Sequence, residues 1–313
     1  MTRLVDVAKR AGVSKSTASN VIRGGALVAE ETRARVERAI AETGYLPNAI
    51  ARSLKIRASK ALAIIVPDLT NPFHAELTVR VERAANAFGY AVLTVHTHCH
   101  SDTEREAGRA LIERRVDGVI ISGISPGSEL PALLLDREIP VALASLGEPD
   151  DPRLGIVDTD DCNAMEAIVD HLFSLGHRAM TFSAQELREH SGTRRRTGFH
   201  ESIARRGLAP VAVEEGATAV VAHNDMQAIS MIDRLERQGR RVPGDVSIVG
   251  FDDIPLASHC RIQLTTVRSD AAQMGRRAVE LVVQAARAAR HIGHREVQSN
   301  PLVVRATTGE PAK

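Results

Sequence analysis

The beginning of the chain restricts its fold most, because two short amphipathic helices are predicted there on either side of a tight turn. Apolar residues recur at helical spacing over Leu4–Ala11, and Thr2 is placed to cap that helix. Gly12-Val13-Ser14 can form the turn, and Ser14 can cap a second helix over Lys15–Ile22. A helix, a three-residue turn with glycine and a second helix that begins with polar residues are typical of a helix-turn-helix unit.

A third helix is predicted over Glu30–Thr43, with Gly44 as its end. Val36, Ala39 and Ile40 form its apolar stripe. Ala29 precedes this helix, and its side chain cannot accept a capping hydrogen bond, which costs about 1 kcal/mol relative to serine. The first 44 residues are therefore expected to form a small three-helix head.

Charge is distributed unevenly along the 313 residues. Residues 1–60 hold 12 Lys and Arg against 5 Asp and Glu, a net charge of +7, whereas residues 61–313 hold 28 against 34, a net charge of −6. A basic head followed by an acidic remainder indicates that the head alone meets a polyanion such as DNA. Arginine-rich helices that are merely solvated would give the same count, so charge does not decide between the two interpretations.

Two motifs in this head resemble the lactose-repressor/galactose-repressor (LacI/GalR) family of bacterial transcriptional regulators. They are residues 6–22 (DVAKRAGVSKSTASNVI) and 44–54 (GYLPNAIARSL). The resemblance implies that the second helix enters the major groove of DNA, with Lys15, Ser16 and Asn20 reading bases and with Thr17 and Ser19 nearer the phosphates. The full set of DNA-binding residues that it implies is Thr2, Ser14, Lys15, Ser16, Thr17, Ser19, Asn20, Asn48, Ala51 and Leu54. Many family members carry arginine where this chain has Asn20.

The same resemblance implies that residues 48–55 form a hinge helix. A helix this short is marginal in water, so it is expected to order only on DNA. Paired hinge helices in the family insert a leucine at the centre of the operator, and Leu54 holds that position here. The alternative is that Leu54 is a linker residue that packs on the rest of the chain.

After Lys60 the pattern changes to short apolar runs that alternate with amphipathic stretches. The runs predict strands at 61–66, 90–95, 118–122, 141–144, 179–182, 219–222 and 246–250. The stretches predict helices after Pro72 and at 102–114, 130–137, 163–175, 197–206 and 226–238. This alternation is typical of α/β proteins, in which helices cover both faces of a parallel sheet.

Segments such as 66–73 (VPDLTNPF) and 246–255 (VSIVGFDDIP) extend the resemblance over nearly the whole chain. It implies an α/β body of two lobes, similar to periplasmic sugar-binding proteins, behind an all-α helix-turn-helix head with a hinge helix. We expect residues 1–57 to be the head and hinge, and 58–313 to be the effector-binding and dimerisation body.

The resemblance also implies an effector site in the cleft between the lobes, outside the carboxyl ends of the strands. Its residues are Asn71, Phe73 and His74 from the first lobe and Arg195, Asn224 and Asp252 from the second. A carboxylate that accepts from two hydroxyls and a guanidinium that donates several N–H groups suit a sugar or sugar derivative. The alternative is that Arg195 and Asp252 form a pair that only bridges the lobes.

One departure from the family concerns residues 207–218, where the second lobe looks shortened. Only 26 residues separate Gly198 from Asn224. The apolar run 211–213 is followed closely by the predicted strand 219–222, and adjacent parallel strands need a crossover of a dozen or more residues. Either 211–213 is not a strand or the lobe is rearranged, and the effector pocket depends on the answer.

Other chemistry is less well supported. His96, His98 and His100 alternate after a predicted strand and could bind zinc or nickel, but no carboxylate clusters beside them in sequence. Ser183 or Cys99 could be a nucleophile, but no base-and-orienter pattern, GxGxxG, P-loop or GxSxG motif accompanies either. We expect no cofactor and no metal.

The sequence therefore predicts a transcriptional repressor whose partners are double-stranded operator DNA, a sugar-like effector and a second copy, as a homodimer or a tetramer. Three scattered cysteines, no apolar stretch of membrane length and no signal peptide at the N-terminus indicate a cytoplasmic protein. Two alternatives remain: a constitutive DNA-binding protein with a degenerate effector lobe, and a sugar-modifying enzyme with a DNA-binding head.

Overall fold

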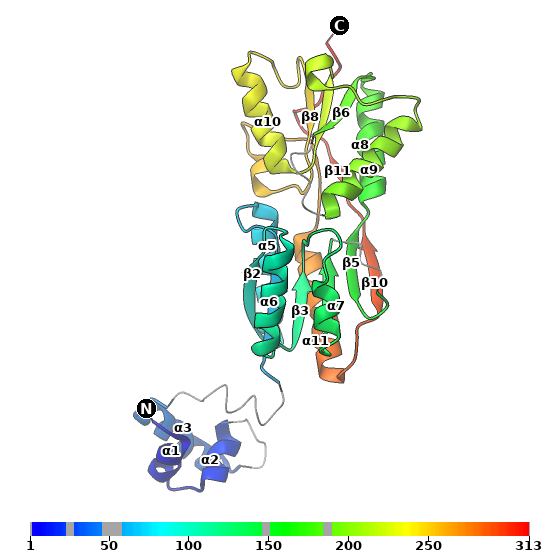
Figure 1. The fold of residues 1–313 in the computed structure, drawn as a ribbon. Helices are drawn as coiled ribbons and strands as arrows, with labels where there is room; N and C mark the ends of the chain where they lie inside the picture. Colours follow the sequence, from blue (N-terminus) through cyan, green and yellow to red (C-terminus); the bar gives the residue numbers. More distant parts are fainter. Residues whose placement is uncertain (1, 23–27, 46–57, 146–150, 184–189, 313) are drawn as a thin grey trace. The chain divides into compact units, whose positions relative to one another are not determined.

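The computed structural model describes residues 2–22, 28–45, 58–145, 151–183 and 190–312 (Figure 1). The chain divides into two units, Met1–Ser59 and Lys60–Lys313, and each is described here by itself. The described residues of the first unit form three helices, and the second unit is a mixed α/β body.

The head contains the three predicted helices, α1 (Leu4–Ala11), α2 (Lys15–Ile22) and α3 (Glu30–Thr43). Their apolar faces meet in one small core of buried side chains, which are Val7, Ala8, Ala11, Ala18, Val21, Val36 and Ala39. Gly12 ends α1 with a φ of 65°, a left-handed conformation that glycine adopts without steric cost. As expected, Ala29 precedes α3 without a side-chain cap.

The predicted cap of α1 by Thr2 is wrong. Arg3 occupies the N-cap position, and the Asp6 carboxylate accepts a hydrogen bond from the Arg3 backbone N–H at 2.8 Å. Thr2 instead donates from its hydroxyl to the backbone carbonyl of Thr43 at 3.0 Å, which ties the start of the chain to the end of α3. An acidic residue in the first turn satisfies an N-terminal N–H as well as a capping hydroxyl would.

The first lobe of the body is built on a six-stranded parallel sheet in the order β10-β5-β4-β3-β1-β2. The strands are β1 (Ala61–Val66), β2 (Ala91–His96), β3 (Gly118–Ile121), β4 (Val141–Ala144), β5 (Gly155–Thr159) and β10 (His294–Gln298). Its helices are α5 (Pro72–Ala87), α6 (Ser101–Glu113), α7 (Leu130–Leu135) and α11 (Ala271–Ala288).

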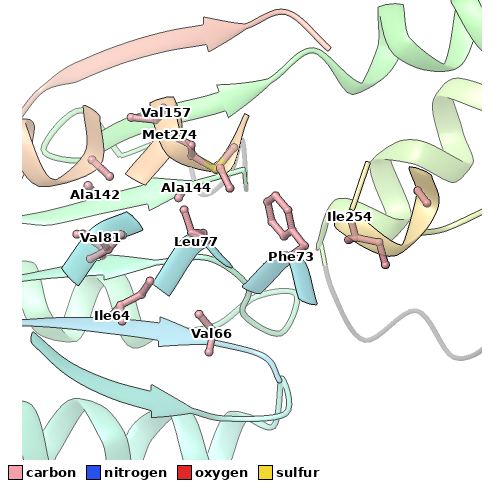
Figure 2. Close-up of a cluster of buried hydrophobic side chains, with 14 of the residues drawn as sticks. Ile64, Val66, Phe73, Leu77, Val81, Ala142, Ala144, Val157, Ile254 and Met274 are labelled. Atoms are coloured by element: carbon pink, nitrogen blue, oxygen red, sulfur yellow. The ribbon is translucent and has the colours of Figure 1, made fainter. Parts of the chain in front are cut away.

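Helices cover both faces of this sheet, as the alternation of β1 shows. Leu62, Ile64 and Val66 join one core with α5 and α11, whereas Ala63 and Ile65 join another with α6 and α7. Figure 2 shows part of the first core, with Leu77 of α5 and Met274 of α11 gathered near the strands. Burial on both faces explains why β1 is a continuous apolar run rather than an alternating one.

The second lobe is smaller. Its three parallel strands, in the order β6-β7-β8, are β6 (Met180–Ser183), β7 (Ala219–Ala222) and β8 (Ser247–Val249). They are accompanied by α8 (Asp161–Ser174), α9 (His190–Ala204) and α10 (Asp225–Arg237), and by an antiparallel pair, β9 (Thr266–Val267) and β11 (Leu302–Val303). Helix α9 begins seven residues before the predicted start of this helix, so Arg195 lies within it.

The question over residues 211–213 is resolved, because this run is not a strand. Val211 donates one backbone hydrogen bond to the carbonyl of Met180 at 2.9 Å, and the chain then turns through a short 3-10 helix, Val213–Glu215, into β7. No parallel crossover is therefore needed between 211–213 and 219–222. In the described part of this lobe, β6 is therefore an edge strand of the sheet.

The chain crosses between the lobes three times, and Asn300 joins all three crossings. Its side-chain oxygen accepts from the backbone N–H of Asp160 at 3.2 Å. Its amide donates to the carbonyl of Arg268 at 3.3 Å and lies 3.2 Å from the hydroxyl of Ser269. The backbone N–H of Ser269 donates in turn to the carbonyl of Asp252, so the crossings connect directly to a predicted effector residue.

Candidate DNA-binding face and effector cleft

The exposed face of α2 carries the predicted base-reading residues. Ala18 and Val21 are buried against the other helices, whereas Lys15, Ser16 and Asn20 are exposed. Thr17 and Ser19, expected nearer the phosphates, are half-buried. Helical periodicity thus separates the side chains that hold α2 from those it presents to a partner.

The turn before α2 is held by hydrogen bonds from both sides. Ser14 accepts from the backbone N–H of Thr17 at 3.0 Å, which confirms its predicted capping role. Arg35 of α3, which sequence analysis missed, donates to the carbonyl of Ala11 at 2.6 Å and to that of Gly12 at 3.0 Å. The angle between α1 and α2 therefore depends on an arginine 24 residues away in sequence. Asn48, Ala51 and Leu54, the predicted hinge residues, lie outside the described residues.

All six predicted effector residues line one small cavity of the body, about 20 Å³ in volume. Asn71, Phe73 and His74 come from the start of α5, Arg195 from α9, and Asn224 and Asp252 from the ends of β7 and β8. We call this the floor cavity, and its complete lining is Asn71, Phe73, His74, Ser122, Gly123, Ser145, Arg195, His223, Asn224 and Asp252. Both lobes thus contribute to one polar site at the carboxyl ends of their strands.

Sequence analysis missed four residues of this lining. Ser122, Gly123 and Ser145 follow β3 and β4, and His223 follows β7. The available signal was positional, because residues that directly follow parallel strands meet at one edge of the sheet. Glu104 of α6 orders the loop after Ser122, where its buried carboxylate accepts from the backbone N–H of Ser125 at 2.7 Å and from its hydroxyl at 2.9 Å.

Arg195 is surrounded by partners. Its guanidinium donates to the carbonyl of His223 at 2.9 Å, lies 3.6 Å from the carboxylate of Asp252 and 3.7 Å from that of Asp161, and stacks 3.6 Å from the ring centre of Phe251. Only 4% of the residue is exposed. Such a guanidinium is fixed in orientation, as a side chain that positions a ligand must be.

The alternative in which Arg195 and Asp252 bridge the lobes is wrong, because both residues belong to the second lobe. The neighbouring Arg194 makes the link instead. It donates to the carboxylate of Asp158 at 2.8 Å and to the carbonyl of Thr159 at 2.7 Å, both at the end of β5 in the first lobe. Of these two adjacent arginines of α9, Arg195 therefore lines the cavity, whereas Arg194 connects the second lobe to the first.

Burial sets the protonation of the two cavity histidines. His74 and His223 are 6% and 8% exposed. Burial, with the charge of Arg195 as a second cause, lowers the pKa of His74 to about 4 and that of His223 to about 3. Both imidazoles are neutral at pH 7.

A larger hollow of about 380 Å³ adjoins the floor cavity and shares Asn71, His74 and Asn224 with it. We call it the vestibule. The rest of its lining is Asp68, Thr70, Ser183, Met226, Gln227, Ser230, Met231 and Arg234. Its volume lies in the range of small-molecule sites, whereas the floor cavity is no larger than one water molecule requires.

The remaining candidates do not form a comparable site. The rings of His96 and His98 lie 5.1 Å apart, but among the described residues no group of three or more His, Cys, Asp or Glu could hold a metal ion. Cys99 is buried, and Ser183 lies in the vestibule. No helix in the described part of the chain is both long enough and apolar enough to cross a membrane.

Family models match both units of the chain. The model of bacterial regulatory proteins of the lacI family matches residues 3–48, and that of periplasmic binding proteins and the sugar binding domain of the LacI family matches 59–218, about half of the chain. The chain belongs to the LacI family. A further model, a periplasmic binding protein-like domain, matches residues 169–308.

Individual LacI-family proteins match nearly the whole chain. The HTH-type transcriptional repressor PurR of Aliivibrio salmonicida is 30% identical, over 97% of this chain and 98% of its own length. The crystal structure of the Lac repressor dimer bound to operator and the anti-inducer ONPF has a TM-score of 0.88 at 25% identity, over 98% of this chain and 99% of that one. The complex of the transcriptional regulator CelR with cellobiose has a TM-score of 0.71 at 27% identity, over 98% and 100%. This LacI-family chain is a DNA-binding transcriptional repressor, and its relatives are regulators of transcription.

Proposed function

We propose that this LacI-family repressor binds a pseudopalindromic operator as a homodimer and is controlled by a small, sugar-like effector bound between its lobes. The observation that carries the proposal is that the six predicted effector residues, three from each lobe, all line the floor cavity. Residues 1–57 are then the DNA-binding head with its hinge, and 58–313 the body that binds effector and dimerises. Because operators lie in the bacterial cytoplasm, we propose that the protein works there.

On this proposal α2 lies in the major groove. Lys15 donates to guanine, Asn20 makes paired hydrogen bonds with adenine, and Ser16 contacts a base edge. Thr17 and Ser19, with Ser14 and Thr2, lie near the phosphates. The exposure of Lys15, Ser16 and Asn20 on one side of α2 supports this assignment.

The hinge is proposed from sequence alone. Residues 48–55 form a helix on DNA, Asn48 and Ala51 contact the operator, and Leu54 inserts into the minor groove at its centre. Replacing Leu54 with alanine then weakens operator binding, whereas an unchanged operator affinity would contradict the hinge assignment.

The polar lining of the floor cavity supports the effector role. Asp252 can accept from two hydroxyls, Asn71 and Asn224 offer amide groups, and Arg195 fixes the geometry between them. The floor cavity holds about 20 Å³, so the lobes must part to admit a ligand and then close on it. Effector binding thereby shifts the two bodies of a dimer against each other and decides whether the hinge helices pair.

Exposed apolar side chains support the homodimer. Val79 of α5 is 43% exposed, and Leu93 of the edge strand β2, none of whose residues is buried, is 37% exposed. Leu69, Met226 and Leu256 are exposed to a similar degree. Because the edge strand β2 packs beside α5, Val79 and Leu93 offer apolar surface to a second copy, and two-fold symmetry would impose a pseudopalindrome on the operator.

The small size of the floor cavity favours one second candidate, a constitutive repressor whose cleft binds nothing. Both candidates require specific DNA binding, so the first experiment selects DNA from a random pool with the purified full chain. The proposal predicts a pseudopalindrome whose two half-sites are related by two-fold symmetry. Recovery of no preferred sequence would contradict it.

A further inference from the structure

Two buried histidines face the floor cavity from opposite lobes. His74 lies in the first turn of α5 in the first lobe, and His223 lies between β7 and α10 in the second. The Nδ1 atom of each is buried and has no hydrogen-bond partner among the described residues. A buried polar atom without a partner costs free energy, so its persistence on a cavity wall points to a ligand that completes it.

Both imidazoles are neutral at pH 7, since burial, and after it the charge of Arg195, lowers their pKa values. A neutral imidazole has one N–H donor and one acceptor nitrogen. Hydroxyl and amide groups, which can donate or accept, match that pair of nitrogens. A carboxylate or a phosphate, which only accepts when fully ionised, matches it less well.

The carboxylates around the floor cavity are already paired with arginines. Arg194 lies 2.8 Å from Asp158 and 3.7 Å from Asp161, and Arg195 lies within 3.7 Å of Asp161 and Asp252. An incoming anion would meet carboxylates that already lie beside both arginines, and an incoming cation would meet Arg195 itself. Both would lose their hydration without gaining an unpaired counter-charge.

The vestibule adds no net charge to the site. It contributes one residue of each sign, Asp68 and Arg234, on its two walls. Its volume of about 380 Å³ accommodates a molecule from the size of a monosaccharide to that of a nucleoside.

We propose that the effector is a small uncharged molecule whose hydroxyl or amide groups bond to His74 and His223 together, joining the two lobes through their histidines. This inference rests on the proposed effector function and defines its ligand class. Because the two histidines belong to different lobes, a ligand that bonds to both stabilises the closed cleft.

The class is tested with sets of related ligands in which one compound is uncharged and its counterparts carry a charged group. The full chain is titrated calorimetrically with D-ribose and D-ribose 5-phosphate, D-glucose, D-glucose 6-phosphate and D-glucosamine, cellobiose and cellobionate, and adenosine and AMP. At least one uncharged compound is expected to bind at least tenfold more tightly than its charged counterparts. A charged compound that binds as tightly as its uncharged partner, or a set in which no uncharged compound binds, would overturn the proposal.

The two histidines are tested with the uncharged compound that binds best. His74→Ala and His223→Ala are each expected to weaken its binding at least tenfold. His223→Asn, which keeps one donor and one acceptor, is expected to lose less. The control is His200→Ala, on an exposed position of α9, which is expected to bind like the parent chain. Unchanged affinity in both histidine variants overturns the inference.

The outcome is separable from that of the proposed function, because operator selection uses no ligand. A chain that selects a pseudopalindrome but prefers charged ligands retains the repressor assignment and loses only the ligand class. A chain that selects no DNA sequence loses the operator proposal whatever it binds in the cleft.

Discussion

The guanidinium of Arg195 lies 3.6 Å from the carboxylate of Asp252 within a single lobe. The two residues therefore form one preassembled wall of the cleft rather than a clasp between lobes. The first lobe supplies the opposite wall through Asn71, Phe73 and His74. A ligand that contacts both walls binds the closed cleft more tightly than the open one. It therefore shifts the equilibrium between the open and closed forms toward the closed form.

Replacing Asp252 with alanine is expected to abolish the effect of ligand on operator binding, because the acceptor for two ligand hydroxyls is lost. Operator affinity is measured by fluorescence anisotropy with and without the compound that the parent chain binds. The control is Asp233→Ala on the exposed side of α10, which should respond like the parent. A normal response in the Asp252 variant would remove this residue from the effector site.

Replacing Lys15 with alanine is expected to lower operator affinity by about 5- to 150-fold, as about 1–3 kcal/mol of base discrimination is lost. The variant should also lose its preference at one base pair of each half-site in a repeated selection. Lys9→Ala removes the same charge from an exposed position of α1 and serves as the control. The assignment fails if both variants weaken binding equally and select the same operator.

Replacing Asn300 with alanine is expected to lower the free energy of unfolding by about 1–3 kcal/mol, because it leaves the Asp160 N–H without its side-chain acceptor and the Ser269 hydroxyl without the Asn300 amide at a buried crossing. Urea denaturation measures this loss. Asn163→Ala removes an exposed amide that bonds to Asp160, so its effect should be much smaller. Equal effects of the two substitutions would show that the hydrogen bonds of Asn300 between the crossings contribute no extra stability to the body.

The buried carboxyl group of Asp225 is expected to make the free energy of unfolding depend on pH. Burial raises its pKa to about 7, although its carboxylate accepts from the Thr266 hydroxyl and the Ile254 N–H. The folded state then holds a proton between about pH 4 and 7 that the unfolded state has released, so this contribution to stability falls as pH rises through that window. Asp225→Asn, which keeps an acceptor for Ile254, is expected to gain stability relative to the parent from pH 5 to pH 8. Parallel pH profiles of the two proteins would contradict the raised pKa.

The proposed dimer predicts that Leu93→Lys, together with Val79→Lys, produces monomers at micromolar concentration. Sedimentation velocity measures the assembly. Val304→Lys changes a side chain that is 55% exposed on the C-terminal segment and should leave the dimer unchanged. A parent chain that sediments as a monomer would remove the dimer from the proposal.

The elements that sequence analysis placed well are those with a strong local signal. The runs at β1, β4 and β7 are apolar on both faces, and their predicted bounds agree with the structure. Strand β10 was missed because it is an edge strand whose sequence, HREVQ, is largely polar and exposed. Strand β5 was also missed, because it ends in the polar residues Asp158 and Thr159, and Asp158 pairs with Arg194 of α9. Helix α11 was also missed, although its apolar stripe is strong.

The residues of the candidate sites also differ in how far the sequence could predict them. The resemblance to the LacI family supplied the six residues that the structure brings together at the floor cavity. Arg35 was missed because its role depends on a partner distant in sequence, the turn at Gly12, whereas His223 was overlooked although it directly follows β7. Thr2 was assigned the N-cap from its residue type, whereas Arg3 occupies that position and the Asp6 carboxylate accepts from the Arg3 N–H.

The most direct test of the central claim is the affinity of the full chain for its selected operator, titrated in the presence of each uncharged compound of the panel. The account predicts that one compound changes the operator dissociation constant at least tenfold in either direction and that the change disappears in Asp252→Ala. An operator affinity that no compound alters would contradict ligand control and leave a constitutive repressor.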